Sequence, residues 1–327
     1  MSPTDATTTV PEGHVPLVAP RPHDRGVRPE SEAPAQPAAG RSLVRALIAT
    51  ARPRQWTKNL LILAAPGAAG VLTHPRVIGQ VALAFASFCL LASATYFVND
   101  VRDRHEDRLH PKKRSRAIAA GELSPAVAFR AAAASLVLGL LLAWIVRPEL
   151  AAVGAGYVVL TASYTLWWRR LALLDVGVIS AGFVLRALAG GIATGVPVSH
   201  WFALTTSFGA LFVASGKRHA ELLAAGRTIG SRPSLGTYSR GLLRALLAIA
   251  LAGALASYCV WAFAKSGHSP WGELTTLPFA LWLLRYARLL KDGAGESPEA
   301  VVFSDRLLIL ATVLWLGLFV LGIYAGH

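Results

Sequence analysis

Apolar segments long enough to cross a membrane follow one another through most of this chain of 327 residues. A helix needs about 20 predominantly apolar residues to span a bilayer, and we predict nine such segments, of which the first and the sixth are short. They are residues 59–72, 77–98, 126–146, 150–168, 173–196, 201–215, 242–264, 274–290 and 307–324. Hydrophobic residues make up 54% of the chain and charged residues only 15%, which excludes an ordinary soluble enzyme. The predicted fold is therefore an all-α integral membrane protein with nine transmembrane helices.

The basic residues alternate between the two sides of this predicted membrane domain. Nearly all of them lie before the first segment or after the second, fourth, sixth and eighth, whereas the opposite loops hold only Arg76, Arg147 and Lys265. Short cytoplasmic loops carry the excess of Lys and Arg, so we expect the N-terminus and the active site in the cytoplasm and the C-terminus outside. The net charge of +14 is then a topology signal and not a sign of nucleic-acid binding, and the expected location is the plasma membrane.

The first 40 residues differ in composition from the rest. They are rich in Pro, Ala, Thr and Glu, and we predict a disordered tail. They lack the apolar stretch and cleavage site of a signal peptide, so we expect the tail to stay on the mature protein, with residues 41–327 forming the membrane domain. The two cysteines, Cys89 and Cys259, lie inside apolar segments, which excludes a disulfide framework and a CxxC metal site.

Polar side chains gather at the cytoplasmic end of the second segment, at Asn99, Asp100, Asp103 and Asp107. Spacings of three and four residues put all four on one face if the helix continues. Clustered carboxylates at a membrane boundary are costly, and the simplest compensation is Mg²⁺ that bridges them to phosphate oxygens. The alternative is a solvated helix end whose aspartates pair with neighbouring arginines.

The loop after this cluster is strongly basic and includes Lys113 and Arg114. Acidic metal ligands followed by cations make a complementary site for a pyrophosphate and its metal. The loop is also what the positive-inside rule alone would produce, so only some of its cations are expected to touch substrate.

These motifs resemble the UbiA prenyltransferase superfamily. The resemblance rests on its first aspartate-rich motif, which matches Asn99-Asp100-x-x-Asp103-x-x-x-Asp107, the basic loop and Gly121-Glu122-Leu123-Ser124. Residues 52–59 and 110–114 are similar to the branch that transfers phosphoribose to decaprenyl phosphate in actinobacterial cell-wall synthesis. The similarity covers residue 52 to the C-terminus and implies a UbiA-type helical bundle with a cytoplasmic active-site cavity. It further implies transfer of 5-phosphoribose from 5-phosphoribosyl 1-diphosphate to a polyprenyl (decaprenyl) phosphate, assisted by Mg²⁺, in arabinan precursor synthesis.

A second polar site is expected at the cytoplasmic end of the sixth segment, at Lys217, Arg218 and Glu221. The superfamily carries a second aspartate motif in this region, whereas this chain has mainly cations. The difference disfavours a prenyl diphosphate donor and favours direct binding of ribose 5-phosphate or lipid phosphate. A cytoplasmic loop that follows the positive-inside rule is the alternative.

Two charged residues lie within the fifth segment, Asp175 and Arg186. They are about 16 Å apart along a helix axis, so a simple ion pair between them is excluded. Local pairing of Asp175 with Arg169 and Arg170, which are close in sequence, is expected instead. An arginine inside a bilayer usually faces a cavity or a partner, and the resemblance associates Arg186 with substrate phosphate.

Three more side chains at predicted helix ends are candidates for substrate binding. By resemblance, Lys58 contacts the diphosphate or ribose phosphate of the donor, although a lysine there also suits the membrane interface. Tyr96 lies one turn before Asn99 and is placed to donate a hydrogen bond to the acceptor phosphate. Tyr96 and Tyr164 also fit the aromatic belt at the interface.

The predicted mechanism is electrostatic. Mg²⁺ is held by Asn99 and Asp103, helped by Asp100 or Asp107, and binds the pyrophosphate leaving group. The lipid phosphate is already an anion and attacks the ribose without a strong base. A prenyltransferase acting on an aromatic acceptor is the nearest alternative, and a transporter would need polar residues through the whole membrane. The expected partners are the two substrates and membrane lipids but not nucleic acid, and the sequence is compatible with a homo-oligomer.

Overall fold

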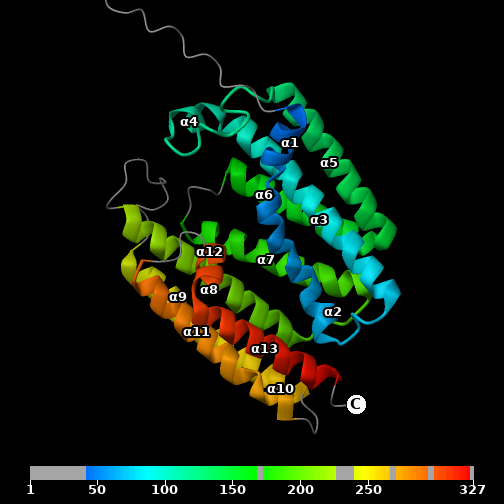
Figure 1. Ribbon diagram of the computed structural model, residues 1–327, viewed down its shortest axis with the longest axis vertical. Helices are drawn as coiled ribbons and strands as arrows, with labels where there is room; N and C mark the ends of the chain where they lie inside the picture. The colour runs from blue at the N-terminus through cyan, green and yellow to red at the C-terminus, as the bar shows by residue number, and fades with distance from the viewer. Residues whose placement is uncertain (1–41, 168–171, 226–238, 266–269, 294–297, 325–327) are drawn as a thin grey trace, which may run out of the picture. The chain divides into compact units, whose positions relative to one another are not determined.

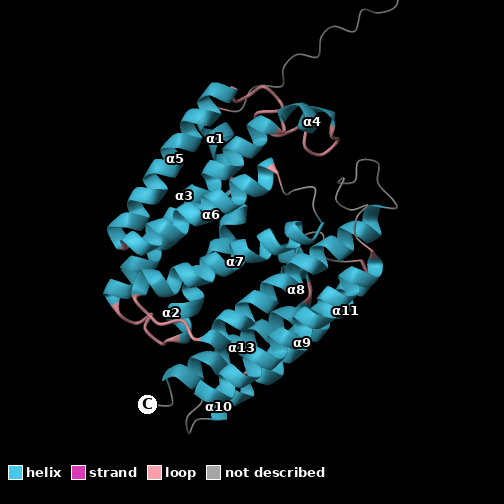
Figure 2. Cartoon of the chain, turned by 180° about the vertical axis from the view of Figure 1, so that it is seen from behind, coloured by secondary structure: helices cyan, strands magenta, loops and turns pink. Residues whose placement is uncertain are grey.

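The computed structural model describes residues 42–167, 172–225, 239–265, 270–293 and 298–324. They belong to one unit, Arg41–His327, and the tail predicted to be disordered, residues 1–40, lies outside the described residues. All regular structure within these ranges is helical, as Figures 1 and 2 show. In chain order the elements are α1 (Leu43–Ala51), the 3₁₀ helix η1 (Pro53–Leu63), α2 (Ala64–Ala68), α3 (Pro75–Arg102), α4 (Arg104–Leu109), α5 (Pro125–Val146), α6 (Pro148–Leu166), α7 (Ala172–Thr194), α8 (His200–Ala225), α9 (Arg240–Lys265), α10 (Pro270–Leu274), α11 (Thr276–Lys291), α12 (Pro298–Ser304) and α13 (Arg306–Tyr324).

Proline and serine residues fix where several helices begin. Pro75, Pro125 and Pro148 stand at the first position of α3, α5 and α6, where the missing N–H has no helical partner to lose. Ser124 caps α5 because its side chain accepts a hydrogen bond from the backbone N–H of Val127. A residue before proline is pushed out of the helical region, so α5 and α6 are separated by a single extended residue.

Within the described ranges, six helices are long and apolar enough to cross a membrane: α3, α5, α6, α7, α9 and α13. Their outer faces carry large apolar side chains, such as Ile145, which is 70% exposed, and Val313, which is 60% exposed. Such faces are stable against lipid and costly in water, and the chain is a multi-pass membrane protein. The other three predicted segments also coincide with helices, but these helices are shorter or more polar.

The first and sixth predicted segments had the wrong boundaries. The first begins as a 3₁₀ helix at Pro53 and becomes α-helical only at Ala64. The sixth does not stop at Ser215, because α8 runs on to Ala225. The basic stretch after Ser215, for which a cytoplasmic loop was the alternative prediction, is therefore helical. A buried ion pair, described below, compensates charge in this part of the helix.

Glycine residues let the helices of the first half pack closely. A Cβ atom added to Gly139 of α5 or to Gly154 of α6 would lie 2.8 or 2.9 Å from the side chain of Leu91 in α3. Leu91 is fully buried in the same core cluster as Phe88. In both ribbon views α5 runs beside α3. Small residues at such crossings are the usual means of bringing membrane helices together.

A close backbone approach joins η1 to α7. A Cβ atom at Gly190 would lie 1.8 Å from the carbonyl oxygen of Ile62 and 2.8 Å from its carbon. Only glycine fits this position without displacing η1. The approach sets Asn59 of η1 against Arg186 of α7, which contributes to the deep polar site.

The second half of the membrane domain has its own core. Phe212, Leu283, Tyr286 and Leu308 form a buried cluster between α8, α9, α11 and α13, and these helices lie together in Figures 1 and 2. Phe212 and Tyr286 meet edge to face, with ring centroids 5.7 Å apart. Helices α7 and α8 pack against each other and link the two halves.

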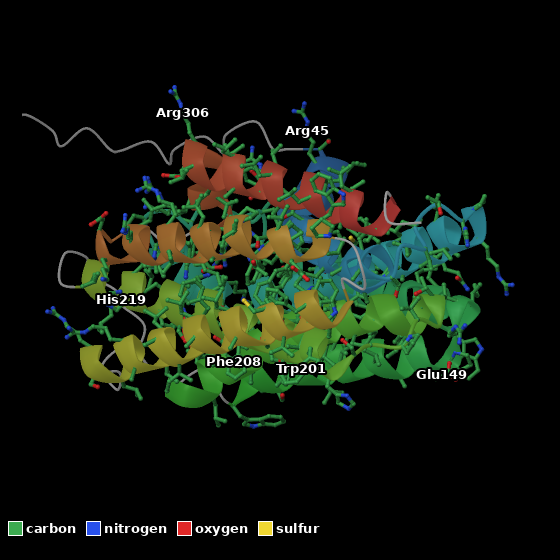
Figure 3. All side chains as sticks on the ribbon, turned by 90° about the horizontal axis from the view of Figure 1, so that it is seen from below. Arg45, Glu149, Trp201, Phe208, His219 and Arg306 are labelled. Carbon is green, nitrogen blue, oxygen red and sulfur yellow. The ribbon has the colours of Figure 1, made fainter. Side chains whose placement is uncertain are left out.

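Polar contacts lie at one end of the helices, and a cavity lies at the other end. Arg102 at the end of α3 donates to the carbonyl of Thr165 at the end of α6 at 2.7 Å, so these two helices end on the same side. In Figure 3, His219 of α8 and Glu149 of α6 lie at opposite ends of the helices. A cavity of about 320 Å³ lies at the end where α2 and α7 finish, and its lining includes Ala68, Trp201 and Trp261.

Candidate active site

Two buried carboxylates lie where α3 gives way to α4. Asp100 is 3% exposed and Asp107 is 2% exposed. Helix α3 ends at Arg102 and α4 begins at Arg104, so the predicted continuous helix is interrupted at Asp103. Hydrogen bonds from the N–H of Asp103 to the carbonyl of Asn99 at 2.9 Å, and from the N–H of Asp107 to the carbonyl of Asp103 at 2.8 Å, carry the helical spacing across the break.

Arginine side chains already neutralise these carboxylates. Arg116 Nη1 lies 2.7 Å from Asp107 Oδ2 and 3.2 Å from Asp100 Oδ1. Arg52 Nη2 donates to the same Asp100 oxygen. One oxygen thus accepts from two guanidinium groups, and one guanidinium nitrogen bridges two carboxylates. The alternative of aspartates paired with arginines therefore describes these contacts, although the arginines are not those nearest in sequence.

Arg52 reaches the cluster from a special backbone position. It separates α1 from η1 with φ 54° and ψ 62°, the left-handed region that residues other than glycine rarely adopt. Its guanidinium carbon lies 5.0 Å from the centre of the Tyr96 ring, within cation–π distance. Tyr96 therefore faces the acidic cluster, where the sequence predicted a substrate-binding role for it.

The cations of the basic loop point in different directions, one into the acidic cluster and several toward the outside. Lys113 and Arg114 are exposed, whereas Arg116 turns into the cluster with its side chain 29% exposed. Arg108 donates to the carbonyl of Ala119 at 2.9 Å and so stabilises the loop. Substrate binding by Lys113 and Arg114 stays a prediction.

A second polar group ties α6, α7 and α8 together. Asp175 is fully buried and accepts from Arg218 Nε, from Arg218 Nη2 at 2.9 Å, and from the hydroxyl of Tyr164. Arg218 is 1% exposed and also binds Glu221. A buried cation with two carboxylate partners is compensated locally, which explains why α8 continues through this charged stretch.

These contacts bear on four predicted residues. Arg218, Glu221 and Tyr164 lie in one group of contacts in which all three bind Asp175 or each other, and their substrate contacts stay predictions. Lys217 is half-buried beside them. The arginines first considered as partners of Asp175, at positions 169 and 170, lie outside the described residues.

A third polar group lies deeper, around Arg186. Its side chain donates to Asn59 Oδ1 at 2.7 Å, to the carbonyl of Gly182 at 2.7 Å and to the hydroxyl of Tyr157 at 2.8 Å. The Tyr157 ring centre is 4.6 Å from the guanidinium carbon. Asp175 and Arg186 thus have separate partners, as their spacing predicted. The partners shown for Arg186 are neutral, so this group of contacts keeps its positive charge.

The sequence reasoning did not single out Arg52, Arg116, Asn59 or Tyr157 as site residues. Arg52 and Arg116 were seen only as members of basic stretches, and nothing in those stretches distinguishes the cation that turns inward. Asn59 is the first residue of the first predicted segment and follows Lys58, which is half-buried and donates to Gln55 Oε1 at 2.5 Å. The sequence signal for Asn59 is that an uncharged polar residue lies within a predicted transmembrane segment.

The fold and these sites define a family of membrane enzymes. The UbiA prenyltransferase family matches residues 60–313, and this chain belongs to it. The decaprenyl-phosphate phosphoribosyltransferase of Corynebacterium glutamicum is 41% identical over 293 residues, which is 87% of this chain and 88% of that protein. The protein of the same name from Mycolicibacterium smegmatis is 39% identical and covers 89% of this chain and 96% of its own length.

Solved structures show the same fold. A UbiA homologue from Archaeoglobus fulgidus bound to GPP and Mg²⁺ superimposes with a TM-score of 0.64 at 19% identity, covering 86% of this chain and 98% of that one. A digeranylgeranylglyceryl phosphate synthase structure gives a TM-score of 0.62 at 15% identity over 86% of this chain and 99% of that one. The UbiA-type fold implied by the sequence motifs is confirmed.

Proposed function

We propose that this protein transfers 5-phosphoribose from 5-phosphoribosyl 1-diphosphate to a polyprenyl phosphate, decaprenyl phosphate by the name of its relatives, and releases pyrophosphate. The product would be a precursor for arabinan in the cell wall. Relatives named for this activity match most of the chain at about 40% identity.

The observation that carries the proposal is the second polar site. A prenyl diphosphate donor calls for acidic side chains there that hold a second metal. Asp175 and Glu221 both bind the buried Arg218, so one of their two negative charges is compensated and both carboxylates already have a cationic partner. Lys217 on the same helix and Arg186 nearer the membrane interior add positive charge, which suits a site for phosphate groups.

The polar sites share one side of the membrane domain. The end of α3 contacts the end of α6 through Arg102 and Thr165, and Tyr164 at the end of α6 contacts Asp175 of α7. Together with the distribution of basic residues, this supports an active site on the cytoplasmic side, and the proposed topology has nine spans with the N-terminus in the cytoplasm. A cytosolic sugar donor and a lipid phosphate in the plasma membrane would then meet at this surface.

The acidic cluster contains the oxygen ligands that a divalent metal such as Mg²⁺ prefers. No three His, Cys, Asp or Glu side chains among the described residues lie close enough to hold a metal by themselves. Asp100 and Asp107, however, both approach one arginine nitrogen within 3.2 Å, so a cation fits between two hard oxygen donors. Asp100, Asp107 and the Asn99 amide, with Asp103 beside them, would hold Mg²⁺, which keeps substrate phosphates in its coordination shell. When bound, the metal would supply positive charge to the leaving pyrophosphate.

The protein's own residues supply binding and orientation. Arg186 is fixed by three hydrogen bonds, and a guanidinium held in this way binds a phosphate in one orientation. Lys58 and Lys217 would hold the remaining phosphate charge. The acceptor is an anion at neutral pH, so no side chain is needed as a strong general base. Excess positive charge keeps two anionic substrates together, and catalysis follows from their proximity.

The test uses purified protein in detergent with polyprenyl phosphate, Mg²⁺ and 5-phosphoribosyl 1-diphosphate. We expect pyrophosphate and a lipid-linked phosphoribose, both detected by mass spectrometry and both lost on chelation. Asp103→Asn should lower turnover at saturating donor, whereas Glu106→Gln, which removes an exposed carboxylate from the same helix end, serves as the matched control. Consumption of a prenyl diphosphate with an aromatic acceptor, and no phosphoribose product, would overturn the proposal.

A further inference from the structure

Arg116 occupies the place between the two buried carboxylates where a metal would have to bind. Its Nη1 atom lies 2.7 Å from Asp107 and 3.2 Å from Asp100. Oxygen ligands lie about 2.0–2.1 Å from Mg²⁺, closer than either carboxylate oxygen lies to this nitrogen, so a metal bound to both oxygens would take the place of the guanidinium. Arginine and metal cannot bind these two oxygens together.

The charges of the cluster support an exchange. Asp100 and Asp107 carry two negative charges, and Arg52 and Arg116 carry two positive ones, so the ion pairs among them are neutral as a group. A divalent cation added without any departure would leave two positive charges in a largely buried site, which is costly. A diphosphate brings negative charge that accommodates both the metal and a released guanidinium.

The two arginines differ in how readily they can leave. Arg52 belongs to the junction of α1 and η1 and also lies over the Tyr96 ring. Arg116 follows the exposed loop residues 111–115 and is not part of a helix. Its side chain is 29% exposed and that of Arg52 is 28% exposed, so the two differ in backbone position and in the Tyr96 contact and not in exposure. An arginine with water on one side can turn outward without breaking a helix or opening the core.

We propose that Arg116 is a resident counter-ion that the divalent metal must displace, so that the metal enters the acidic cluster together with the diphosphate donor. Arg116 is thus a positioning residue. It holds Asp100 and Asp107 close together before the metal arrives, and it lowers the affinity for metal alone. This inference rests on the proposed function, because that function supplies the donor.

The experiment measures binding of Mn²⁺ alone by the loss of its free-ion EPR signal, with no donor and no turnover. Arg116→Gln should raise the apparent affinity on the order of tenfold. Arg116→Lys keeps the charge but cannot bridge both carboxylates in the same way, and it should also raise the affinity. Arg108→Gln removes an equal charge from the neighbouring helix α4, at a side chain that donates to the Ala119 carbonyl, and should change the affinity less than about twofold.

The outcomes separate this inference from the proposed function. Unchanged or weaker Mn²⁺ binding in both Arg116 variants would overturn the inference, and so would an equal rise in Arg108→Gln, since general electrostatics would then explain the effect. If Arg116→Gln does not fold, Arg116→Lys decides. Failure of the proposed function would appear as absent phosphoribose product in the wild type, whatever the Mn²⁺ titration shows.

Discussion

Substitution of Gly190 by alanine tests the contact between η1 and α7 on which the deep polar site depends. The added Cβ would lie 1.8 Å from the Ile62 carbonyl oxygen, well inside any real contact distance, and the neighbour is backbone and cannot rotate away. The 3₁₀ helix must therefore move. Overpacking of this kind costs about 1–3 kcal/mol, and a lost hydrogen bond to a charged group costs about 1.5–3 kcal/mol.

The second cost applies because the displaced helix carries Asn59, which accepts from Arg186 at 2.7 Å. Alanine gains about 1 kcal/mol over glycine in helix propensity, so we expect a net loss of roughly 3 kcal/mol in unfolding free energy and a larger relative loss of turnover. The matched control is Gly177→Ala in the same helix, where a Cβ meets nothing within 4 Å. That variant should be as stable as the wild type or slightly more stable.

The assay is thermal unfolding in detergent, followed by near-UV circular dichroism, with turnover measured on the same preparations. A Gly190→Ala protein as stable and active as Gly177→Ala would refute the close approach of η1 to α7. A protein that is destabilised but fully active would confirm the contact between η1 and α7 and show that activity does not depend on it.

Three further predictions concern charged side chains. Asp175→Asn weakens the compensation of the buried Arg218, so the unfolding free energy should fall by about 3–5 kcal/mol. Denaturation in detergent measures this free energy. A fall of less than about 1 kcal/mol would contradict the buried pair. Arg186→Lys keeps the charge but loses the fixed hydrogen bonds, and turnover should fall about a hundredfold in a protein that still folds; unchanged turnover would exclude Arg186 from the site. The Arg285 side chain and the N–H of Leu308 hold the pKa of Asp305 below its usual range, so its contribution to stability is present above the usual aspartate pKa and is lost as the pH falls through the lowered value. Acid unfolding of Asp305→Asn should lack this part of the pH dependence, and curves that coincide with the wild type would refute it.

The long apolar helices were predictable because their signal is local. A run such as residues 126–146 has the length and composition of a span whatever surrounds it, and the structure gives α5 as Pro125–Val146. Pro125 stands at the first position of this helix, one residue before the predicted start. The family could also be inferred, since Asn99 and the aspartates that follow lie in one short motif.

The rest depended on contacts between distant elements. Nothing near residue 215 indicates that α8 continues, because the partner that compensates Arg218 is Asp175 on another helix. The 3₁₀ form of η1 lies against α7 at Gly190, a contact that local sequence does not reveal. Among the cations of the basic loop, only folding distinguishes Arg116, which turns inward, from Lys113, which stays outside.

Arg52 affects stability in two separable ways, through the strain of its left-handed backbone and through the ion pair of its side chain. A residue other than glycine in this region costs about 1–3 kcal/mol, and the same residue supplies a guanidinium to Asp100. Arg52→Ala and Arg52→Gly lose the same ion pair, but only glycine also relaxes the backbone. The difference in stability between the two variants therefore measures the conformational cost of the turn, and the loss that they share measures the value of the guanidinium, which pairs with Asp100 and lies over the Tyr96 ring.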